Sequence, residues 1–268
     1  MDFADKLFND DCLNILSEMS AESVDCVVTD CPYRISAGGV TIEVGGKEMG
    51  GVLNDVNIVF NSACGRKWAK KDGTVPSAVK NGKMFANNDI AFSDWLPLVY
   101  KVLKKGTHCY VMINSRNLKE LQTEAEKAGF VFQNLLVWNK KNATPNKYYM
   151  QGCEFILMLS KRPARNINDM GTPNLITIPN ILGKGVKHHP TAKPVELMEL
   201  LIRNSTAKGE VVLDPFVGGG STLVAAKRLG RHYVGCEIDT HFYEMALGNL
   251  QKMDKEQKQL DLFNTQDL

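Results

Sequence analysis

Apolar runs of strand length alternate with amphipathic segments along most of the chain. Apolar positions at helical spacing, several closed by a glycine, predict helices near residues 13–19, 94–105, 118–128, 195–206, 221–229 and 241–255. Continuous apolar runs predict buried strands at residues 24–30, 107–113, 130–138, 153–159, 210–214 and 232–237. This alternation predicts an α/β fold, in which helices cover both faces of a mostly parallel sheet.

Two long stretches show no sustained period. Residues 34–88 are rich in Gly, Asn, Lys and Ser, and prolines interrupt residues 160–188. Both are locally basic, with six lysines and arginines against one acid in each of the segments 66–83 and 161–193, as solvated loops also are. The chain length suits one domain, residues 1–268, with two irregular basic insertions at 34–88 and 160–188 and a flexible tail at 256–268.

Composition excludes several classes of protein. The net charge of +2 does not by itself indicate a nucleic-acid partner. No apolar stretch approaches the roughly 20 residues that span a bilayer, and the acidic start is unlike a signal peptide. The seven cysteines are scattered without a C-x-x-C pair, so we interpret them as reduced thiols and expect no metal site. We therefore expect a soluble, cytoplasmic protein with no membrane partner.

A glycine-rich turn at residues 214–221 lies between a predicted strand and a predicted helix. Glycines there let the backbone approach a ligand, and free N–H groups face it. Glu237 ends the next strand, where a carboxylate can accept hydrogen bonds from the ribose hydroxyls of an adenosine. A nicotinamide dinucleotide would also suit this turn, but Leu223 stands where its third glycine is expected.

The sequence Asp-Pro-Phe-Val-Gly-Gly-Gly-Ser of this turn resembles the Asp-Pro-Phe-x-Gly-x-Gly-Ser/Thr motif of class I methyltransferases. The resemblance implies a Rossmann-like sheet and S-adenosylmethionine as cofactor. Residues 189–194 look like the family's segment that reaches the cofactor carboxylate, and Asp11 is similar to an aspartate that approaches the adenine, although it also suits a helix N-cap. The cofactor-binding residues so implied are Asp11, Cys12, Thr191, Lys193, Asp214, Pro215, Phe216, Gly218, Gly220, Ser221 and Glu237.

The turn Asp30-Cys31-Pro32-Tyr33 follows a predicted buried strand. Exocyclic amines of bases are poor nucleophiles because their lone pair is delocalised into the ring. Asp30 and the Cys31 carbonyl could accept both N–H hydrogens and restore that lone pair in a dry pocket. Pro32 keeps Cys31 extended, and Tyr33 offers a flat face for a flipped base. Taken alone, the same residues are also typical of an ordinary turn.

The turn at residues 30–33 precedes the glycine turn at 214–221 in the chain. This is the motif order of the β-class DNA amino-methyltransferases, in which the catalytic motif precedes the cofactor motif, and the chain resembles that family from about residue 10 to 250. Cys31 departs from the family's Asp/Asn/Ser-Pro-Pro-Tyr/Phe pattern, which leaves the approach of Asp30 to the carbonyl less rigid. Asp30 favours adenine N6 as the target, with cytosine N4 as the alternative. The family places target recognition outside the core sheet, which implies a DNA clamp at 34–88 and a recognition segment at 160–188.

Several alternatives stay open at the level of sequence. The DNA can be duplex or single-stranded, because flipping costs less when a base is already unpaired. A homodimer is one candidate for the oligomeric state, and a companion restriction enzyme is neither implied nor excluded. One rival hypothesis is a nicotinamide oxidoreductase, which the missing glycine disfavours. Another is a catalytically silent DNA-binding module, which only the departure at Cys31 supports.

Overall fold

The computed structural model describes residues 3–32, 42–44, 47–49, 90–144, 149–180 and 193–266, with side chains described up to residue 254. The chain divides into two units, one of residues 1–31 and 90–268 and the other of residues 32–89. The predicted single domain therefore consists of a main unit and a separate compact insertion. In the described part of the insertion, β3 (Ile42–Val44) pairs antiparallel with β4 (Lys47–Met49).

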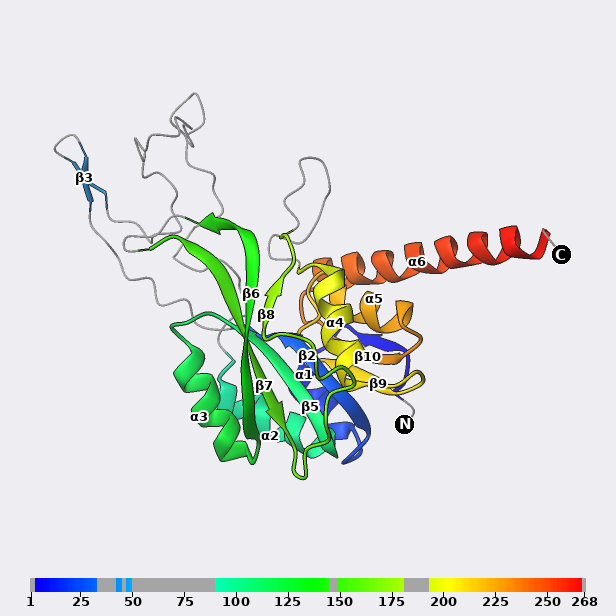
Figure 1. Ribbon diagram of the computed structural model, residues 1–268, viewed down its shortest axis with the longest axis horizontal. Helices are drawn as coiled ribbons and strands as arrows, with labels where there is room; N and C mark the ends of the chain where they lie inside the picture. Colours follow the sequence, from blue (N-terminus) through cyan, green and yellow to red (C-terminus); the bar gives the residue numbers. More distant parts are fainter. Residues whose placement is uncertain are drawn as a thin grey trace. The chain divides into compact units, whose positions relative to one another are not determined.

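An eight-stranded sheet forms the centre of the described main unit, in the order β1-β10-β9-β2-β5-β7-β6-β8 (Figure 1). Neighbouring strands pair parallel, except that β7 pairs antiparallel with both β5 and β6. The predicted mostly parallel sheet is thus confirmed. The strands are β1 (Lys6–Phe8), β2 (Val24–Asp30), β5 (Leu103–Ile113), β6 (Val131–Thr144), β7 (Gln151–Ser160), β8 (Leu175–Thr177), β9 (Val211–Asp214) and β10 (His232–Cys236).

Helices cover both faces of this sheet, as predicted (Figure 1). On one face α2 contacts α1, α3 and β5, and α3 reaches β6 and β7. On the other face α4 packs on β2 and β5, α5 packs on β9 and β10, and α6 lies beside α5 and β1. The helices are α1 (Cys12–Glu18), α2 (Phe92–Val102), α3 (Leu118–Ala128), α4 (Val195–Ser205), α5 (Ser221–Arg228) and α6 (Thr240–Gln266).

Local chemistry explains where these helices begin and end. α3 ends at Gly129, whose φ of 106° is a left-handed conformation that glycine adopts readily. α2 starts at Phe92, two residues before the predicted start, and the Asp94 carboxylate accepts from the backbone N–H of Ala91. Trp95, Leu96, Val99 and Val102 are fully buried, so packing stabilises the helix despite Pro97 within it.

The structure differs from the prediction at the edges of the sheet and at the C-terminal end. The three-residue strands β1 and β8 were not predicted, and β6 continues to Thr144 beyond the predicted end at residue 138. These segments are extended because each pairs with a neighbour, β1 with β10, β8 with β6, and β6 with β7. α6 continues through the predicted tail to Gln266, in a stretch that contains neither Gly nor Pro.

In the described residues, none of the helices is both long and apolar enough to cross a membrane.

Candidate active site

The carboxyl ends of β2 and β9 lie side by side, because these strands pair with Cys26 opposite Val212 and Val27 opposite Leu213. The turn predicted to be catalytic follows β2, and the glycine turn follows β9. The buried Thr29 hydroxyl joins the two strand ends by donating to the Asp214 carboxylate at 2.7 Å. Parallel α/β sheets bind ligands at this edge, so the predicted catalytic and cofactor segments meet where a site is expected.

Asp214 holds the glycine turn in place. Its Oδ1 accepts from the backbone N–H of Phe216 at 3.0 Å as well as from Thr29. Burial raises the pKa of Asp214 to about 6, against the lowering effect of the hydrogen bonds from Thr29, Phe216 and Thr222. Since its carboxylate oxygen is engaged by the protein's own donors, Asp214 acts as a structural acceptor of the turn.

The backbone of the glycine turn is closely packed against α6 and β10. Gly220 has a φ of 87°, and a Cβ there would lie 3.0 Å from the Cβ of Ala246 in α6. Gly235 in β10 supports the turn from below, where a Cβ would lie 2.6 Å from Val217 Cγ2. The turn can therefore present bare backbone at the start of α5, where N–H groups favour a carboxylate. This geometry fits the methionine half of S-adenosylmethionine.

Glu237 follows β10, and both of its carboxylate oxygens are oriented by backbone donors. Oε2 accepts from the N–H of Gly218 at 2.8 Å, and Oε1 accepts from the N–H of Asp239 at 2.9 Å. Burial raises the pKa of Glu237 even though these bonds favour its ionised form. Each oxygen has a second lone pair, so the carboxylate can still accept from two ribose hydroxyls. The adenosine half of the cofactor therefore also fits.

Asp11 is the N-cap of α1, where its carboxylate accepts from the N–H of Leu13 at 2.9 Å. The N-cap interpretation is confirmed, and a contact of Asp11 with the adenine stays a prediction. The neighbouring Cys12 is buried, and burial raises its thiol pKa to about 12. Sequence reasoning missed Asn9, whose side-chain amide donates to the Glu237 carbonyl at 2.8 Å and ties this segment to the site.

Phe216 packs at the edge of the fully buried Trp95, with ring centroids 5.2 Å apart and planes at 85°. This contact anchors the glycine turn to α2 on the opposite side of the sheet from α5. Of the other predicted cofactor residues, the Ser221 hydroxyl donates to the carbonyl of Lys193 at 2.8 Å. Thr191 lies outside the described residues, as does the predicted catalytic Tyr33.

Asp30, at the end of β2, forms an ion pair with Lys193, with Nζ 2.5 Å from Oδ2. Burial raises the pKa of Asp30, and the adjacent ammonium of Lys193 opposes that rise. The resemblance assigned Lys193 to the cofactor carboxylate, but the structure places its ammonium on the catalytic turn and its carbonyl at the cofactor helix. Cys31 is buried, and its thiol lies 3.7 Å from the Met112 carbonyl, so its side chain belongs to the core.

Two further charged residues of this region escaped sequence reasoning. Glu154 in β7 lies 3.6 Å from Lys193 through Oε2, and its Oε1 lies 3.1 Å from Lys140 in β6. A lone acid at the start of the apolar run 153–159 is the signal that could have identified Glu154.

The predicted recognition segment, 160–188, begins away from the site. Lys161 donates to the carbonyls of Tyr100 and Leu103, and Arg165 is paired with Glu210. The backbone of Lys161 and Arg165 is hydrogen-bonded to Gly106, near the start of β5. Asp30 pairs with Met112 near the other end of that strand. Lys161 and Arg165 are therefore engaged within the fold, and DNA recognition by residues 160–188 stays a prediction. Residues 181–188 lie outside the described residues.

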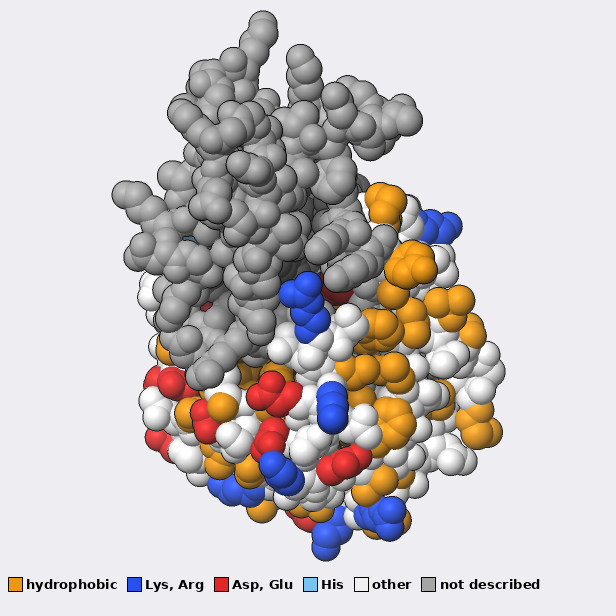
Figure 2. All heavy atoms as spheres, turned by 90° about the vertical axis from the view of Figure 1, so that its left-hand side faces the viewer, with side chains coloured by type: hydrophobic (Ala, Val, Ile, Leu, Met, Phe, Trp, Pro, Cys, Tyr) orange, Lys and Arg blue, Asp and Glu red, His pale blue; other side chains and the backbone are white. Residues whose placement is uncertain are grey.

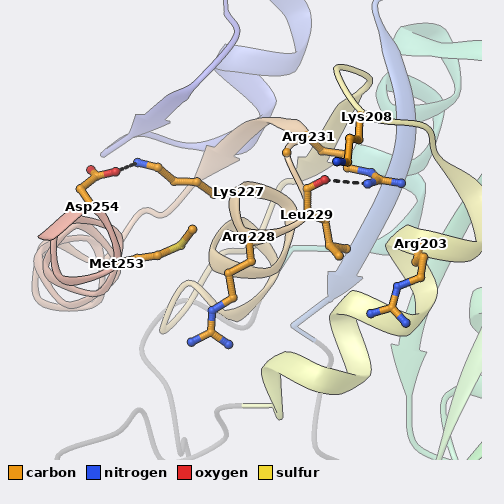
Figure 3. Close-up of a pocket in the computed structure, with 9 residues that line it drawn as sticks. Arg203, Lys208, Lys227, Arg228, Leu229, Arg231, Met253 and Asp254 are labelled. Atoms are coloured by element: carbon orange, nitrogen blue, oxygen red, sulfur yellow. Dashed lines mark hydrogen bonds and ion pairs between the residues drawn. The ribbon is translucent and has the colours of Figure 1, made fainter. Parts of the chain in front are cut away.

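A pocket of about 590 Å³ lies at the ends of α4 and α5 beside α6 (Figure 3). Arg231 donates to the carbonyls of Leu229 and Thr206, at the ends of these helices. Figure 3 shows its bond to Leu229 and the ion pair between Lys227 and Asp254. Cations at helix C-termini satisfy carbonyls and complement the helix dipole, so we attribute this basic lining to helix stability. The cations of the lining are Arg203, Lys208, Lys227, Arg228 and Arg231.

Comparison with known proteins decides between the candidate families. The model of the N6/N4 methyltransferase family, described as DNA methylase, matches residues 24–248. The chain belongs to this DNA methylase family. The methylase is 29% identical over 265 residues to the Type II methyltransferase M2.DpnII of Streptococcus pneumoniae, covering 91% of this chain and 89% of that protein. It is 25% identical over 284 residues to the Type II methyltransferase M.HinfI of Haemophilus influenzae, covering 98% and 73%.

Solved structures support the fold of the methylase. The M1.HpyAVI–SAM complex aligns with a TM-score of 0.58 at 20% identity, covering 91% of this chain and 98% of that chain. PvuII DNA methyltransferase, which is cytosine-N4-specific, aligns with a TM-score of 0.64 at 16% identity, covering 93% and 90%. The chain thus has the class I methyltransferase fold and is an S-adenosylmethionine-dependent DNA methyltransferase.

Proposed function

We propose that this methylase transfers the methyl group of S-adenosylmethionine to the exocyclic N6 of an adenine that is flipped out of DNA. One observation carries the proposal. Asp30 ends β2 directly beside the glycine turn that follows β9, and the bond from Thr29 to Asp214 joins the two strand ends. A base amine at Asp30 would then lie next to a cofactor held by the turn.

Asp30 accepts a hydrogen bond from one N–H of the amine, and the carbonyl of Cys31 accepts a hydrogen bond from the other. Together they localise the lone pair on the nitrogen. This role needs the ionised carboxylate. Lys193 supports it, because an ammonium 2.5 Å away opposes the rise in pKa that burial causes. Pro32 restricts Cys31 to extended backbone and so aims its carbonyl. We assign the stacking of the flipped base to Tyr33.

The cofactor supplies an electrophilic methyl group on a positively charged sulfur. We assign its ribose hydroxyls to Glu237 and its carboxylate to the backbone at the start of α5, with Thr191 and the Ser221 region beside it. Asp11 and Cys12 are assigned to the adenine side, and Phe216 shapes the turn from below. The residues proposed to hold the cofactor are Asp11, Cys12, Thr191, Lys193, Asp214, Pro215, Phe216, Gly218, Gly220, Ser221 and Glu237.

We propose that DNA contacts come from residues 34–88 and from residues 160–188. Within 160–188, Lys161 and Arg165 are engaged in the fold, so we assign phosphate contacts to the later lysines of the segment. Lysines and arginines that contact phosphates make binding fall steeply with salt. The slope of log Kd against log salt for a duplex should therefore decrease when Lys184 and Lys187 are both replaced by glutamine. An unchanged slope would refute the assignment of Lys184 and Lys187 to the DNA interface.

Transfer of labelled methyl groups to DNA, followed by mass spectrometry of the digested nucleosides, tests the central proposal. We expect N6-methyladenine from the wild-type protein and none from Asp30→Ala, whose circular dichroism and cofactor binding should match the wild type. N4-methylcytosine as the product would refute the adenine assignment and keep the catalytic turn. Full activity of Asp30→Ala would refute the role of the turn.

We propose further that the methylase acts in the cytoplasm and forms a homodimer. Apolar side chains on the α3 side of β6 and β8 support this, with Phe132 and Leu175 37% and 55% exposed beside the half-buried Leu135 and Val137. Figure 2 shows hydrophobic side chains gathered over an extended area of the face that lies to the left in Figure 1. Light scattering on the protein eluted from a size-exclusion column should give a molar mass of two chains. The variant Leu175→Lys should give the mass of one chain. A wild-type mass of one chain would refute the dimer.

A further inference from the structure

Four alternating charges run across one face of the sheet to the catalytic turn. Lys140 in β6 contacts Oε1 of Glu154 in β7, and Oε2 of Glu154 contacts Lys193, which also contacts Asp30 at the end of β2. The side chains are mostly shielded, with the lysines 11% exposed and the carboxylates 30% exposed. Charges with so little water around them interact more strongly than surface pairs.

The strand register keeps these groups on one face. Asp30 is opposite Met112, Met112 is opposite Ile156, and Glu154 lies two residues before Ile156 on the same side of β7. Glu154 is in turn opposite Trp138, two residues before Lys140. Since rigid strands hold three of the four charges, the chain of charges can fix the position of Lys193 over the catalytic turn.

Lys193 connects this chain to the cofactor region. Its carbonyl accepts from the Ser221 hydroxyl at the first residue of α5, while its ammonium lies between Asp30 and Glu154. Without Glu154, the ammonium of Lys193 would lose a carboxylate partner. Its contact with Oδ2 of Asp30 would remain, but the direction from which the ammonium meets that oxygen would be less restrained.

We propose that Glu154 and Lys140 are positioning residues of methyl transfer, which act on Asp30 through Lys193. This inference rests on the proposed catalytic role of Asp30. The reacting amine must meet Asp30 and the Cys31 carbonyl together, and a displacement of about 1 Å can cost on the order of a hundredfold in rate. Glu154 does not contact the base or the cofactor in this proposal, and Lys193 reaches the cofactor helix through its carbonyl, away from Glu154. Loss of Glu154 should therefore affect the chemical step and leave substrate binding intact.

Glu154→Gln in the full-length protein tests the proposal, with labelled methyl transfer to duplex DNA as the assay. We expect kcat to fall about tenfold or more, while KM for DNA and for S-adenosylmethionine stay within about twofold. Glu124→Gln is the matched control, because it breaks an ion pair with Lys127 of 2.7 Å on α3, away from the site. The control should retain wild-type kinetics, and both variants should keep the wild-type melting temperature within a few degrees.

The pH profile separates positioning from a merely structural role. Asp30 faces Lys193, Glu154 and Asp214, and the thiol of Cys31 lies next to it. The negative charge of Glu154 adds to the rise in the pKa of Asp30 that burial causes, so Glu154→Gln should lower this pKa. The acid limb of the pH profile of kcat should then move to lower pH. A lower kcat with an unmoved acid limb would overturn the proposal.

Lys140→Met probes the same chain of charges from its outer end and keeps the proposal testable if Glu154→Gln fails to fold. We expect a lower kcat with unchanged KM values and rescue by Lys140→Arg, which restores a cation to Glu154. Wild-type kcat in both Glu154→Gln and Lys140→Met, together with an inactive Asp30→Ala, would overturn the positioning role alone. Full activity of Asp30→Ala would instead overturn the catalytic assignment on which it depends.

Discussion

Replacing Gly220 by alanine tests whether the tight packing behind the glycine turn is needed for cofactor binding. Two costs can be worked out from the structure. The φ of 87° is left-handed, which costs about 1–2 kcal/mol for a residue with a Cβ. The new Cβ would also lie 3.0 Å from the Cβ of Ala246 and 3.1 Å from its Cα, and such overpacking costs about 1–3 kcal/mol. The free energy of unfolding should therefore fall by about 2–5 kcal/mol.

Gly209→Ala is the matched control for the backbone cost. Gly209 has a φ of 79°, and among the described residues beyond its chain neighbours nothing lies within 4 Å of where a Cβ would stand, so the variant carries the left-handed cost without crowding. Urea unfolding should show a loss of about 1–2 kcal/mol for Gly209→Ala and more for Gly220→Ala. The difference between the two variants measures the contact with Ala246.

Cofactor affinity is the second measurement. In Gly220→Ala, the new Cβ can move away from Ala246 only if the turn shifts, because Ala246 belongs to the buried face of α6. We expect the Kd of S-adenosylmethionine, measured by calorimetry, to rise about tenfold or more in Gly220→Ala, which is about 1.4 kcal/mol, and to be unchanged in Gly209→Ala. Adding Ala246→Gly should recover part of both losses. Equal cofactor affinities in the two alanine variants, or no recovery, would refute the reasoning.

Three further predictions concern buried polar groups. Burial raises the pKa of Asp214 to about 6, so its contribution to stability is present below the ordinary value near 4 and is lost as pH rises through 6. Between pH 4 and pH 8 the free energy of unfolding, measured in urea, should fall by about 3 kcal/mol less in Asp214→Asn than in the wild type. Equal pH dependence in the two proteins would contradict this. Thr29→Val removes the donor to this carboxylate and should cost about 1.5–3 kcal/mol while weakening cofactor binding. Ser205→Ala removes a hydroxyl that bonds to His108 and Tyr110, so melting should show a loss of about 1–3 kcal/mol with kcat unchanged.

The central elements of the sheet could be predicted because each contains its own signal. β2, β9 and β10 are apolar runs, and α3 ends at a glycine as predicted. β1 and β8 are three residues long and are extended only because β10 and β6 pair with them. Such pairing is a property of distant sequence, so short edge strands leave little local trace.

The candidate site was predictable in its parts and not in its contacts. Motif order placed Asp30 and Asp214 at strand ends, and the parallel pairing of β2 with β9 brings them together. The partner of Lys193 could not be inferred, since Asp30 lies 163 residues away and its position depends on how α4 packs. Glu154 was overlooked because an acid in an apolar strand acquires meaning only from the neighbours it meets across the sheet.

The pairing of β2 with β9 also determines when this protein can become active during its synthesis. The bond from Thr29 to Asp214 spans 185 residues, so the catalytic turn leaves the ribosome long before the strand that completes the site. Chains are made at about 5–20 residues per second, which gives an interval on the order of ten seconds or more without a cofactor site. A chain broken off before residue 211 contains the Asp30 turn but lacks both β9 and the glycine turn that follows it. The fold therefore makes methylation of DNA depend on synthesis of the chain beyond the glycine turn.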